Sequence, residues 1–265
     1  KYIMHLASPF PFKVSNNRNS LLAPAVDGTL RVLNAGLNAD VEQFIVTSSI
    51  AAMFRKPNRS NPYSFNENDW TDENWKEGVN DYFLSKTKAE KAAWELMKSK
   101  GLKNKLTMIN PGGVFGDALD KKGGTSIEYV RQFLKGKFPA APKWGILISD
   151  VKDVAKAHVA CIGNTKVGGR RLIVGKEVKK LIELSQIMAE AMPEYAKKLP
   201  KKELPNFMVK LISLFDSSAK TLIPDLEIVM QTDTTYAEEL LGLKFNPAKG
   251  CISETAKSVV RLGLV

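Results

Sequence analysis

The sequence predicts an α/β protein with a doubly wound parallel sheet, followed by a smaller and mostly helical region. Short apolar or β-branched runs alternate with segments of helical periodicity, which is the pattern of βα units in a parallel sheet. Three of these runs end in small or hydroxyl residues, at Ser8, Ser49 and Pro111-Gly112. Because the carboxyl ends of such strands meet at one edge of the sheet, we expect these residues to lie together beside a ligand.

The regular elements follow from local periodicity and composition. Val26, Leu30 and Leu33, for example, recur at helical spacing. The predicted strands are 2–7, 43–49, 106–110, 145–149 and 171–174. The predicted helices are 26–37, 81–96, 126–134, 154–162, 181–192, 205–217 and, as the last, 233–241. The stretches 10–22 and 57–78 are polar and contain proline, so we expect loops there.

The segment 81–96 contains the pair of residues that suggests a reaction. It is rich in Ala, Lys, Glu and Leu and lacks Gly and Pro, and Asn80 or Asp81 can cap its first turn. Tyr82 and Lys86 are four residues apart, so their side chains lie on one face of this helix. We expect the ammonium to lower the tyrosine pKa from its ordinary value of about 10, so that the phenol exchanges a proton with a carbonyl or alcohol.

A tyrosine followed four residues later by a basic residue is weak evidence when it stands alone. With six tyrosines and 39 basic residues in the chain, such a pair is expected by chance on the order of once. The alternative is a solvated lysine beside a half-buried tyrosine. The strand ends at Ser8, Ser49 and Pro111 favour the catalytic interpretation, because the predicted fold brings them to the same edge.

Composition and charge restrict the classes of function. The net charge of +11 comes mostly from scattered lysines, so we predict a solvated basic surface and no nucleic-acid binding. No apolar run reaches the roughly 18 residues of a membrane span, and we expect no membrane partner. Two cysteines and two histidines are too few for a disulfide framework or a metal site, so we expect no metal and a reducing, cytoplasmic location.

Several short segments occur in an order that is typical of one family. They are His5-Leu6-Ala7-Ser8-Pro9, Val26-Asp27-Gly28-Thr29, Val46-Thr47-Ser48-Ser49, Tyr82-x-x-Ser85-Lys86-Thr87, Ala89-Glu90-Lys91-Ala92-Ala93-Trp94-Glu95, Asn110-Pro111-x-x-Val114-Phe115-Gly116 and Asp150-Val151-x-Asp153-Val154-Ala155-x-Ala157-His158. Over essentially its whole length the chain resembles the extended short-chain dehydrogenases/reductases. The most similar branch comprises dihydroflavonol, cinnamoyl-CoA and methylglyoxal (aldehyde) reductases. The resemblance implies a Rossmann-like fold and reduction of a small-molecule ketone or aldehyde with NADP as cofactor, or NAD as the alternative.

The resemblance also implies roles for individual residues. Tyr82 would be the general acid, Lys86 would lower its pKa and hold the nicotinamide ribose, and Ser49 would hydrogen-bond the substrate oxygen. The alternative for Ser49 is a strand-end hydroxyl that satisfies a backbone group. The other cofactor-binding residues would be Ala7, Ser8 and Ser48, then Pro111, Gly112 and Val114 beside the nicotinamide, and Ser126 at the pyrophosphate. For Pro111-Gly112 the alternative is a simple turn.

The chain departs from the family pattern at its start. No Gly-rich phosphate loop precedes the strand at 2–7, and two βα units, about 70 residues, are missing relative to the family. We therefore expect an N-terminally incomplete dinucleotide-binding domain at 1–116, with later crossings near 145–175, and a substrate-binding region mainly at 117–265. The alternatives are a truncated, inactive paralogue that serves as a binding or scaffold protein, and an epimerase or dehydratase on the same fold. Family analogy leaves monomer and homodimer open.

Overall fold

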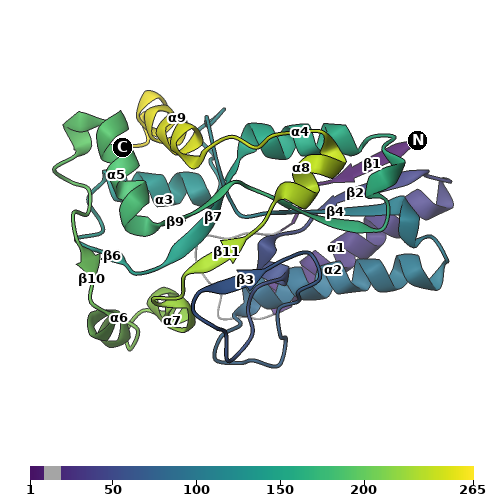
Figure 1. The fold of residues 1–265 in the computed structure, drawn as a ribbon, viewed down its shortest axis with the longest axis horizontal. Helices are drawn as coiled ribbons and strands as arrows, with labels where there is room; N and C mark the ends of the chain where they lie inside the picture. Colours follow the sequence, from purple (N-terminus) through teal and green to yellow (C-terminus); the bar gives the residue numbers. More distant parts are fainter. Residues whose placement is uncertain (9–18) are drawn as a thin grey trace.

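The structure is a computed structural model that describes residues 1–8 and 19–265. Its helices are α1 (Asn19–Asn38), α2 (Asp81–Ser99), α3 (Thr125–Leu134), α4 (Val151–Cys161), α5 (Leu181–Ala191), α6 (Asn206–Ile212), α7 (Ser217–Leu222), α8 (Thr235–Leu241) and α9 (Ala248–Arg261). Its strands are β1 (Tyr2–His5), β2 (Gln43–Thr47), β3 (Tyr63–Phe65), β4 (Leu106–Pro111), β5 (Gly113–Phe115), β6 (Ala141–Pro142), β7 (Gly145–Asp150), β8 (Arg170–Val174), β9 (Glu177–Lys180), β10 (Glu203–Leu204) and β11 (Met230–Thr232). Figure 1 shows their arrangement.

The central sheet contains β1, β2, β4 and β8 in that order, and all of its strands are parallel. Ile45 of β2 lies opposite Met4 of β1 and Thr107 of β4, and Ile109 of β4 lies opposite Leu172 of β8. Parallel neighbours require crossover connections, which α1 provides between β1 and β2 and α2 between β2 and β4. The predicted parallel sheet with flanking helices is therefore confirmed.

Strand alternation explains why helices cover both faces of this sheet. Successive side chains of a strand point to opposite faces. Phe44 of β2 therefore packs with Leu33 of α1 and Met97 of α2, whereas the next residue, Ile45, packs with Ala157 of α4. In Figure 1, α1 and α2 lie on one side of the sheet and α4 and α8 on the other. Both faces are apolar because both are buried.

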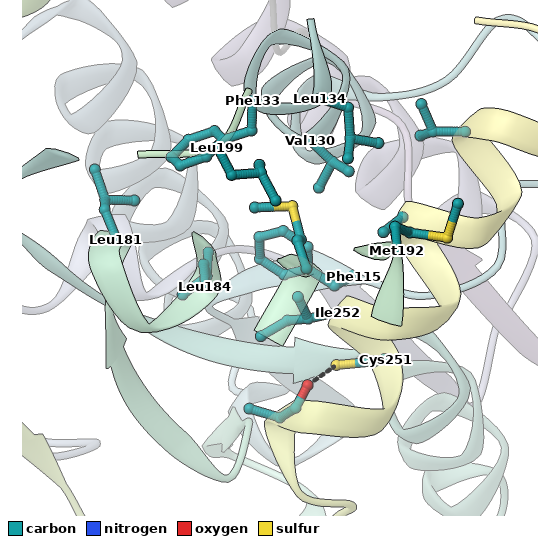
Figure 2. Packing of buried hydrophobic residues seen from close by; sticks show 14 of the residues in the cluster. Phe115, Val130, Phe133, Leu134, Leu181, Leu184, Met192, Leu199, Cys251 and Ile252 are labelled. Carbon is teal, nitrogen blue, oxygen red and sulfur yellow. Dashed lines mark hydrogen bonds between the residues drawn. The ribbon is translucent and has the colours of Figure 1, made fainter. Parts of the chain in front are cut away.

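A second sheet, of β5, β7 and β9, continues the molecule beyond the central one. Here β5 and β7 are parallel and β9 is antiparallel to β7. Helices α3, α5 and α9 pack against it through a large apolar cluster that includes Phe115, Phe133, Leu184 and Ile252, as Figure 2 shows. This cluster is the core of the region that follows Gly116.

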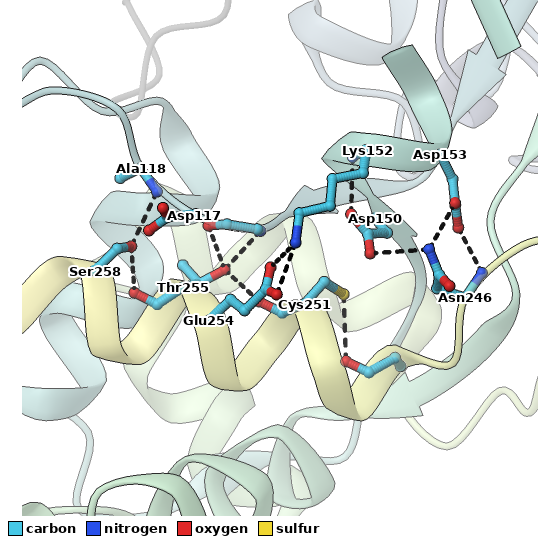
Figure 3. A network of polar contacts seen from close by, with 12 residues as sticks. Asp117, Ala118, Asp150, Lys152, Asp153, Asn246, Cys251, Glu254, Thr255 and Ser258 are labelled. Atoms are coloured by element: carbon cyan, nitrogen blue, oxygen red, sulfur yellow. Dashed lines mark hydrogen bonds and ion pairs between the residues drawn. The ribbon is translucent and has the colours of Figure 1, made fainter. Parts of the chain in front are cut away.

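The helix α9 corrects the prediction that 233–241 is the last helix. Hydroxyl residues occupy part of its buried face, which weakens the apolar periodicity on which the prediction depended. The same hydroxyls have a structural role, shown in Figure 3: Thr255 Oγ1 accepts from Gly116 N at 2.7 Å, and Ser258 Oγ accepts from Ala118 N at 3.0 Å. The loop after β5 is thus held against α9.

Three other expectations need correction. The predicted helix 205–217 is too long: α6 ends at Ile212, where the Ser213 hydroxyl donates back to the carbonyl of Lys210 at 2.6 Å, and α7 begins only at Ser217. The predicted loop 57–78 contains β3, which pairs in parallel with the distant β11. Of the predicted loop 10–22, residues 10–18 lie outside the described residues and 19–22 belong to α1.

Candidate active site

Helix α2 positions the tyrosine and lysine that the sequence singled out. Its first turn is capped by Asn80, whose side-chain oxygen accepts from Phe83 N at 3.0 Å. Tyr82 is half-buried, Lys86 is only 8% exposed, and the lysine Nζ lies 5.9 Å from the centroid of the tyrosine ring. The predicted neighbourhood of the two side chains is confirmed.

Ser49 joins this pair from the end of β2. Its Oγ accepts from Ala51 N at 3.1 Å and so caps the short 3-10 turn Ile50–Ala52. The same side chain is hydrogen-bonded to Tyr82. A hydroxyl has one donor and two acceptor sites, so both interactions are compatible. The backbone-capping alternative for Ser49 is therefore observed, and it coexists with the contact that the catalytic interpretation requires.

Burial determines the protonation states in this cluster. It raises the pKa of Tyr82 to about 12, and the hydrogen bond to Ser49 offsets only part of that rise. The predicted lowering of the tyrosine pKa is therefore wrong for this structure, because desolvation is larger than the interactions that favour the phenolate. Burial also lowers the pKa of Lys86 to about 8, against the opposing attraction of Glu90. At pH 7 the site thus holds a neutral phenol beside a mostly charged ammonium.

A small pocket lies beside Lys86 at the carboxyl ends of β1 and β2. It brings together four of the predicted cofactor-binding residues, Ala7, Ser8, Ser48 and Lys86. The other lining residues are His5, Thr29, Val46, Thr47, Ala89, Glu90 and Met108. Burial, and secondarily the charge of Lys86, lower the pKa of His5. The pocket lining thus combines the hydroxyl residues Ser8, Thr29, Thr47 and Ser48 with the ammonium of Lys86.

The segment after β4 lies beside Ser49, and its glycine at position 112 is required by packing against a neighbouring strand. Asn110 Nδ2 donates to the carbonyl oxygen of Ser49 at 3.1 Å, which places the start of the Pro111-Gly112 segment next to that serine. A Cβ on Gly112 would collide with the backbone carbonyl of Leu147 in β7. The glycine at position 112 is thus explained by the close approach of a neighbouring strand.

The two remaining predicted cofactor residues lie further along the chain. Val114 is in β5, opposite Ser149 of β7. Ser126 lies in the first turn of α3, and it is not among the described residues that line the pocket beside Lys86. Their predicted roles stay predictions.

Comparison with known proteins identifies the family. The sequence model of the NAD dependent epimerase/dehydratase family matches residues 1–175. The chain belongs to this family.

Several curated relatives of this family member are reductases by name. It is similar to NADPH-dependent methylglyoxal reductase GRE2 of Saccharomyces cerevisiae, with 31% identity over 280 residues that cover 98% of this chain and 77% of that protein. It is also similar to cinnamoyl-CoA reductase 1 of Petunia hybrida, with 30% identity over 262 residues that cover 98% of this chain and 71% of that protein.

Solved structures agree with these relatives. The yeast methylglyoxal/isovaleraldehyde reductase Gre2 complexed with NADPH superimposes with a TM-score of 0.78 at 29% identity, covering 99% of this chain and 77% of that one. The predicted resemblance to the reductase branch and the Rossmann-like fold are confirmed.

Sequence reasoning missed one residue of the candidate site. Glu90 is 2% exposed and lines the pocket beside Lys86. In the sequence it resembles any charged residue of a helix, although its spacing of four from Lys86 puts it on the same face. That spacing was the available signal.

Two further features are absent from the described part of the chain. Residues 1–8 and 19–265 contain no group of three or more His, Cys, Asp or Glu side chains that could hold a metal ion. No helix of these residues is long and apolar enough to cross a bilayer.

Proposed function

We propose that this protein is an NADPH-dependent carbonyl reductase that converts a small ketone or aldehyde to an alcohol. The observation that carries the proposal is the Ser49–Tyr82 hydrogen bond beside the buried Lys86. Relatives that the chain matches over nearly its whole length are named as NADPH-dependent reductases, which supports NADPH as cofactor, with NADH as the alternative.

The residues beside Lys86 fit the nicotinamide ribose of such a cofactor. Ser8, Thr47 and Ser48 offer hydroxyl groups and Lys86 offers an ammonium, and all of them line one pocket. Vicinal ribose hydroxyls are bound by donors and acceptors of this kind. We assign Ala7, Ser8, Ser48, Tyr82 and Lys86 to cofactor binding, together with Pro111, Gly112, Val114 and, at the pyrophosphate, Ser126. The bound cofactor supplies the hydride.

Tyr82 is the proton donor in the proposed reaction. Burial keeps its phenol neutral, so the hydroxyl proton is available at physiological pH. When the carbonyl carbon is reduced, its oxygen gains negative charge and takes this proton. Ser49 donates a hydrogen bond to the same oxygen and stabilises that charge. The ammonium of Lys86, one helical turn away, stabilises the phenolate that remains on Tyr82.

We further infer a reducing, cytoplasmic location and a monomer or homodimer. Cys161 and Cys251 are free and buried, and burial raises the pKa of each thiol to about 12. Thiols that stay protonated and shielded fit a compartment in which disulfides are rare.

The proposal is tested by replacing the proton donor. The Tyr82→Phe variant should lose about 10²-fold or more of kcat, because it lacks the hydroxyl that protonates the carbonyl oxygen. NADPH oxidation with methylglyoxal and isovaleraldehyde, the substrates in the names of the relatives, gives the rates. Tyr236→Phe, at a partly exposed tyrosine of α8, is the matched control and should keep the wild-type rate. Equal turnover by wild type and Tyr82→Phe would overturn the proposal.

A further inference from the structure

The carboxylate of Glu90 is the most completely hydrogen-bonded charge near the proposed site. The side chain has no exposed surface, and it projects from α2 one turn after Lys86. The residues 82, 86 and 90 therefore share one face of the helix. A carboxylate in such a position is costly to bury unless its oxygens are fully paired.

Four donors pair with the two carboxylate oxygens, and three of them come from outside α2. Oε2 accepts from Ser48 Oγ at 2.5 Å and from Asn110 Nδ2 at 2.8 Å. Oε1 accepts from Arg171 Nε at 2.6 Å and from Trp94 Nε1, on the same helix, at 3.2 Å. The carboxylate thus connects α2 with the end of β2, with β4 and with β8.

The contacts of Arg171, taken alone, would suggest that its ion pair with Glu90 only stabilises the fold. Its guanidinium stacks on Trp70, 3.8 Å from the ring centroid, and also donates to the carbonyl oxygens of Glu67 at 3.0 Å and Asp69 at 2.5 Å. These contacts fix the guanidinium, and its ion pair with Oε1 neutralises one side of Glu90. They do not explain why the other oxygen faces Ser48 and Asn110.

Asn110 extends the network to the main chain of Ser49. The same Nδ2 group that donates to Glu90 also donates to the carbonyl oxygen of Ser49 at 3.1 Å. Ser48 binds the carboxylate directly. Both residues of the Ser48–Ser49 pair are therefore fixed by one carboxylate, at the place where the Ser49 hydroxyl meets Tyr82.

We propose that Glu90 is a positioning residue of the reductase site: it fixes the Ser48–Ser49 turn through Ser48 and Asn110, and it is the counter-charge of Lys86. The proposal rests on the proposed function for its catalytic part. Lys86 is faced by Glu90 and Tyr82 from its own helix and by His5 from β1. Among these three, Glu90 is the only carboxylate, and it is paired with the guanidinium of Arg171.

The first test measures the charge of Lys86 and needs no activity. In the 265-residue chain, an NMR titration of the lysine side chains, with Lys86 assigned through Lys86→Arg, gives its pKa. Burial lowers the pKa of Lys86 to about 8 while Glu90 opposes that shift. Glu90→Gln should therefore lower it by about one further unit.

The control is a second lysine-pairing carboxylate. Lys91 lies on the same helix as Lys86, and its Nζ is 2.5 Å from Oε1 of the partly exposed Glu73. Glu73→Gln removes this partner of Lys91 and should leave the Lys86 pKa unchanged. A Lys86 pKa that is the same in wild type and Glu90→Gln would overturn the proposal. If Glu90→Gln does not fold, Glu90→Gln/Arg171→Met removes both buried charges and replaces it in the same titration.

The second test follows the reaction. In Glu90→Gln, kcat should fall about 10-fold or more with a smaller change in the carbonyl KM, because Ser49 and Lys86 act on the reacting oxygen and the phenolate. The alkaline limb of the pH profile of kcat should move to lower pH, whereas Glu73→Gln should match wild type. An unmoved limb would contradict the role of Glu90. A wild-type chain without reductase activity would instead contradict the proposed function, and the NMR titration would still decide the role of Glu90.

Discussion

At the scale of single residues, desolvation sets the protonation states that the proposed chemistry requires. Tyr82 stays protonated at neutral pH because its phenolate would be poorly solvated where it lies. His158 illustrates the same effect outside the site. It is 3% exposed, its Nδ1–H donates to the carbonyl oxygen of Val154 at 2.7 Å, and its Nε2 accepts from Thr47 Oγ1 at 2.7 Å. Burial lowers its pKa below 6.5.

The neutral state of His158 predicts a pH dependence of stability. Below pH 6.5 the unfolded chain binds a proton at this position that the folded chain does not, so the free energy of unfolding falls as the pH decreases. The contribution is fully present above pH 6.5 and is lost below it, by up to about 1.4 kcal/mol per pH unit. Urea unfolding at pH 7.5 and 5.5 should show a smaller loss in His158→Gln than in wild type. Equal losses in the two proteins would contradict this account.

The spacing of residues in the sequence predicted which side chains of the proposed site are neighbours. It did not predict how deeply they are buried. The four-residue spacing of Tyr82 and Lys86 fixes their shared face in any helix, so their proximity was predictable. The direction of the tyrosine pKa shift was not, because it depends on what covers the helix. Glu90 was missed for the same reason: Asn110 and Arg171, which pair with it, come from strands elsewhere in the chain.

At the scale of elements, buried charges connect α2 with the segment that contains α7. Asp225, fully buried just after α7, pairs with Arg55 and with Arg59 Nη1, the latter at 2.7 Å. The guanidinium of Arg55 also lies 4.0 Å from the ring centroid of Phe83, the residue after Tyr82. The region after residue 216 is thus held against the first turn of the helix that carries the proposed proton donor.

Removal of this carboxylate should destabilise the protein strongly. Asp225→Ala leaves two buried guanidinium groups without their counter-charge, for which we expect a loss of about 3–5 kcal/mol in the free energy of unfolding. Chemical denaturation measures it. The control is Glu227→Ala, which breaks the exposed pair with Lys143 and should leave stability essentially unchanged. A small effect of Asp225→Ala, similar to that of the control, would show that the buried pair does not hold these elements together.

Elements with strong local periodicity were predicted, and those that depend on distant partners were not. The central strands and α2 could be located within a few residues, because their apolar and helix-forming patterns are local. Strands β3 and β11 are each three residues long and pair across most of the chain, so neither has a local signal. Helix α9 buries Thr255 and Ser258 where an apolar stripe would be expected.

At the scale of the whole molecule, the proposed site lies where the two sheets meet. Ser49 follows β2 of the central sheet, and Asn110 near the end of β4 donates to its carbonyl. The next residues pass into β5 of the second sheet, where Gly112 allows close contact with β7. The chain then returns through β8 to the edge of the central sheet. Strands of the two sheets therefore alternate along the sequence. The proposed site at this junction is therefore positioned by residues of both sheets.

The most direct test of the account is an NADPH titration of the 265-residue chain, followed by nucleotide fluorescence, with NADH in parallel. We predict saturable binding of NADPH by wild type, because Ser8, Ser48 and Lys86 line one pocket, which we assign to the nicotinamide ribose. Binding should be clearly weaker in Lys86→Met, which removes the ammonium but keeps a side chain of similar length. Absence of saturable binding to wild type, or equal affinity in Lys86→Met, would contradict the central claim that this site holds a nicotinamide cofactor.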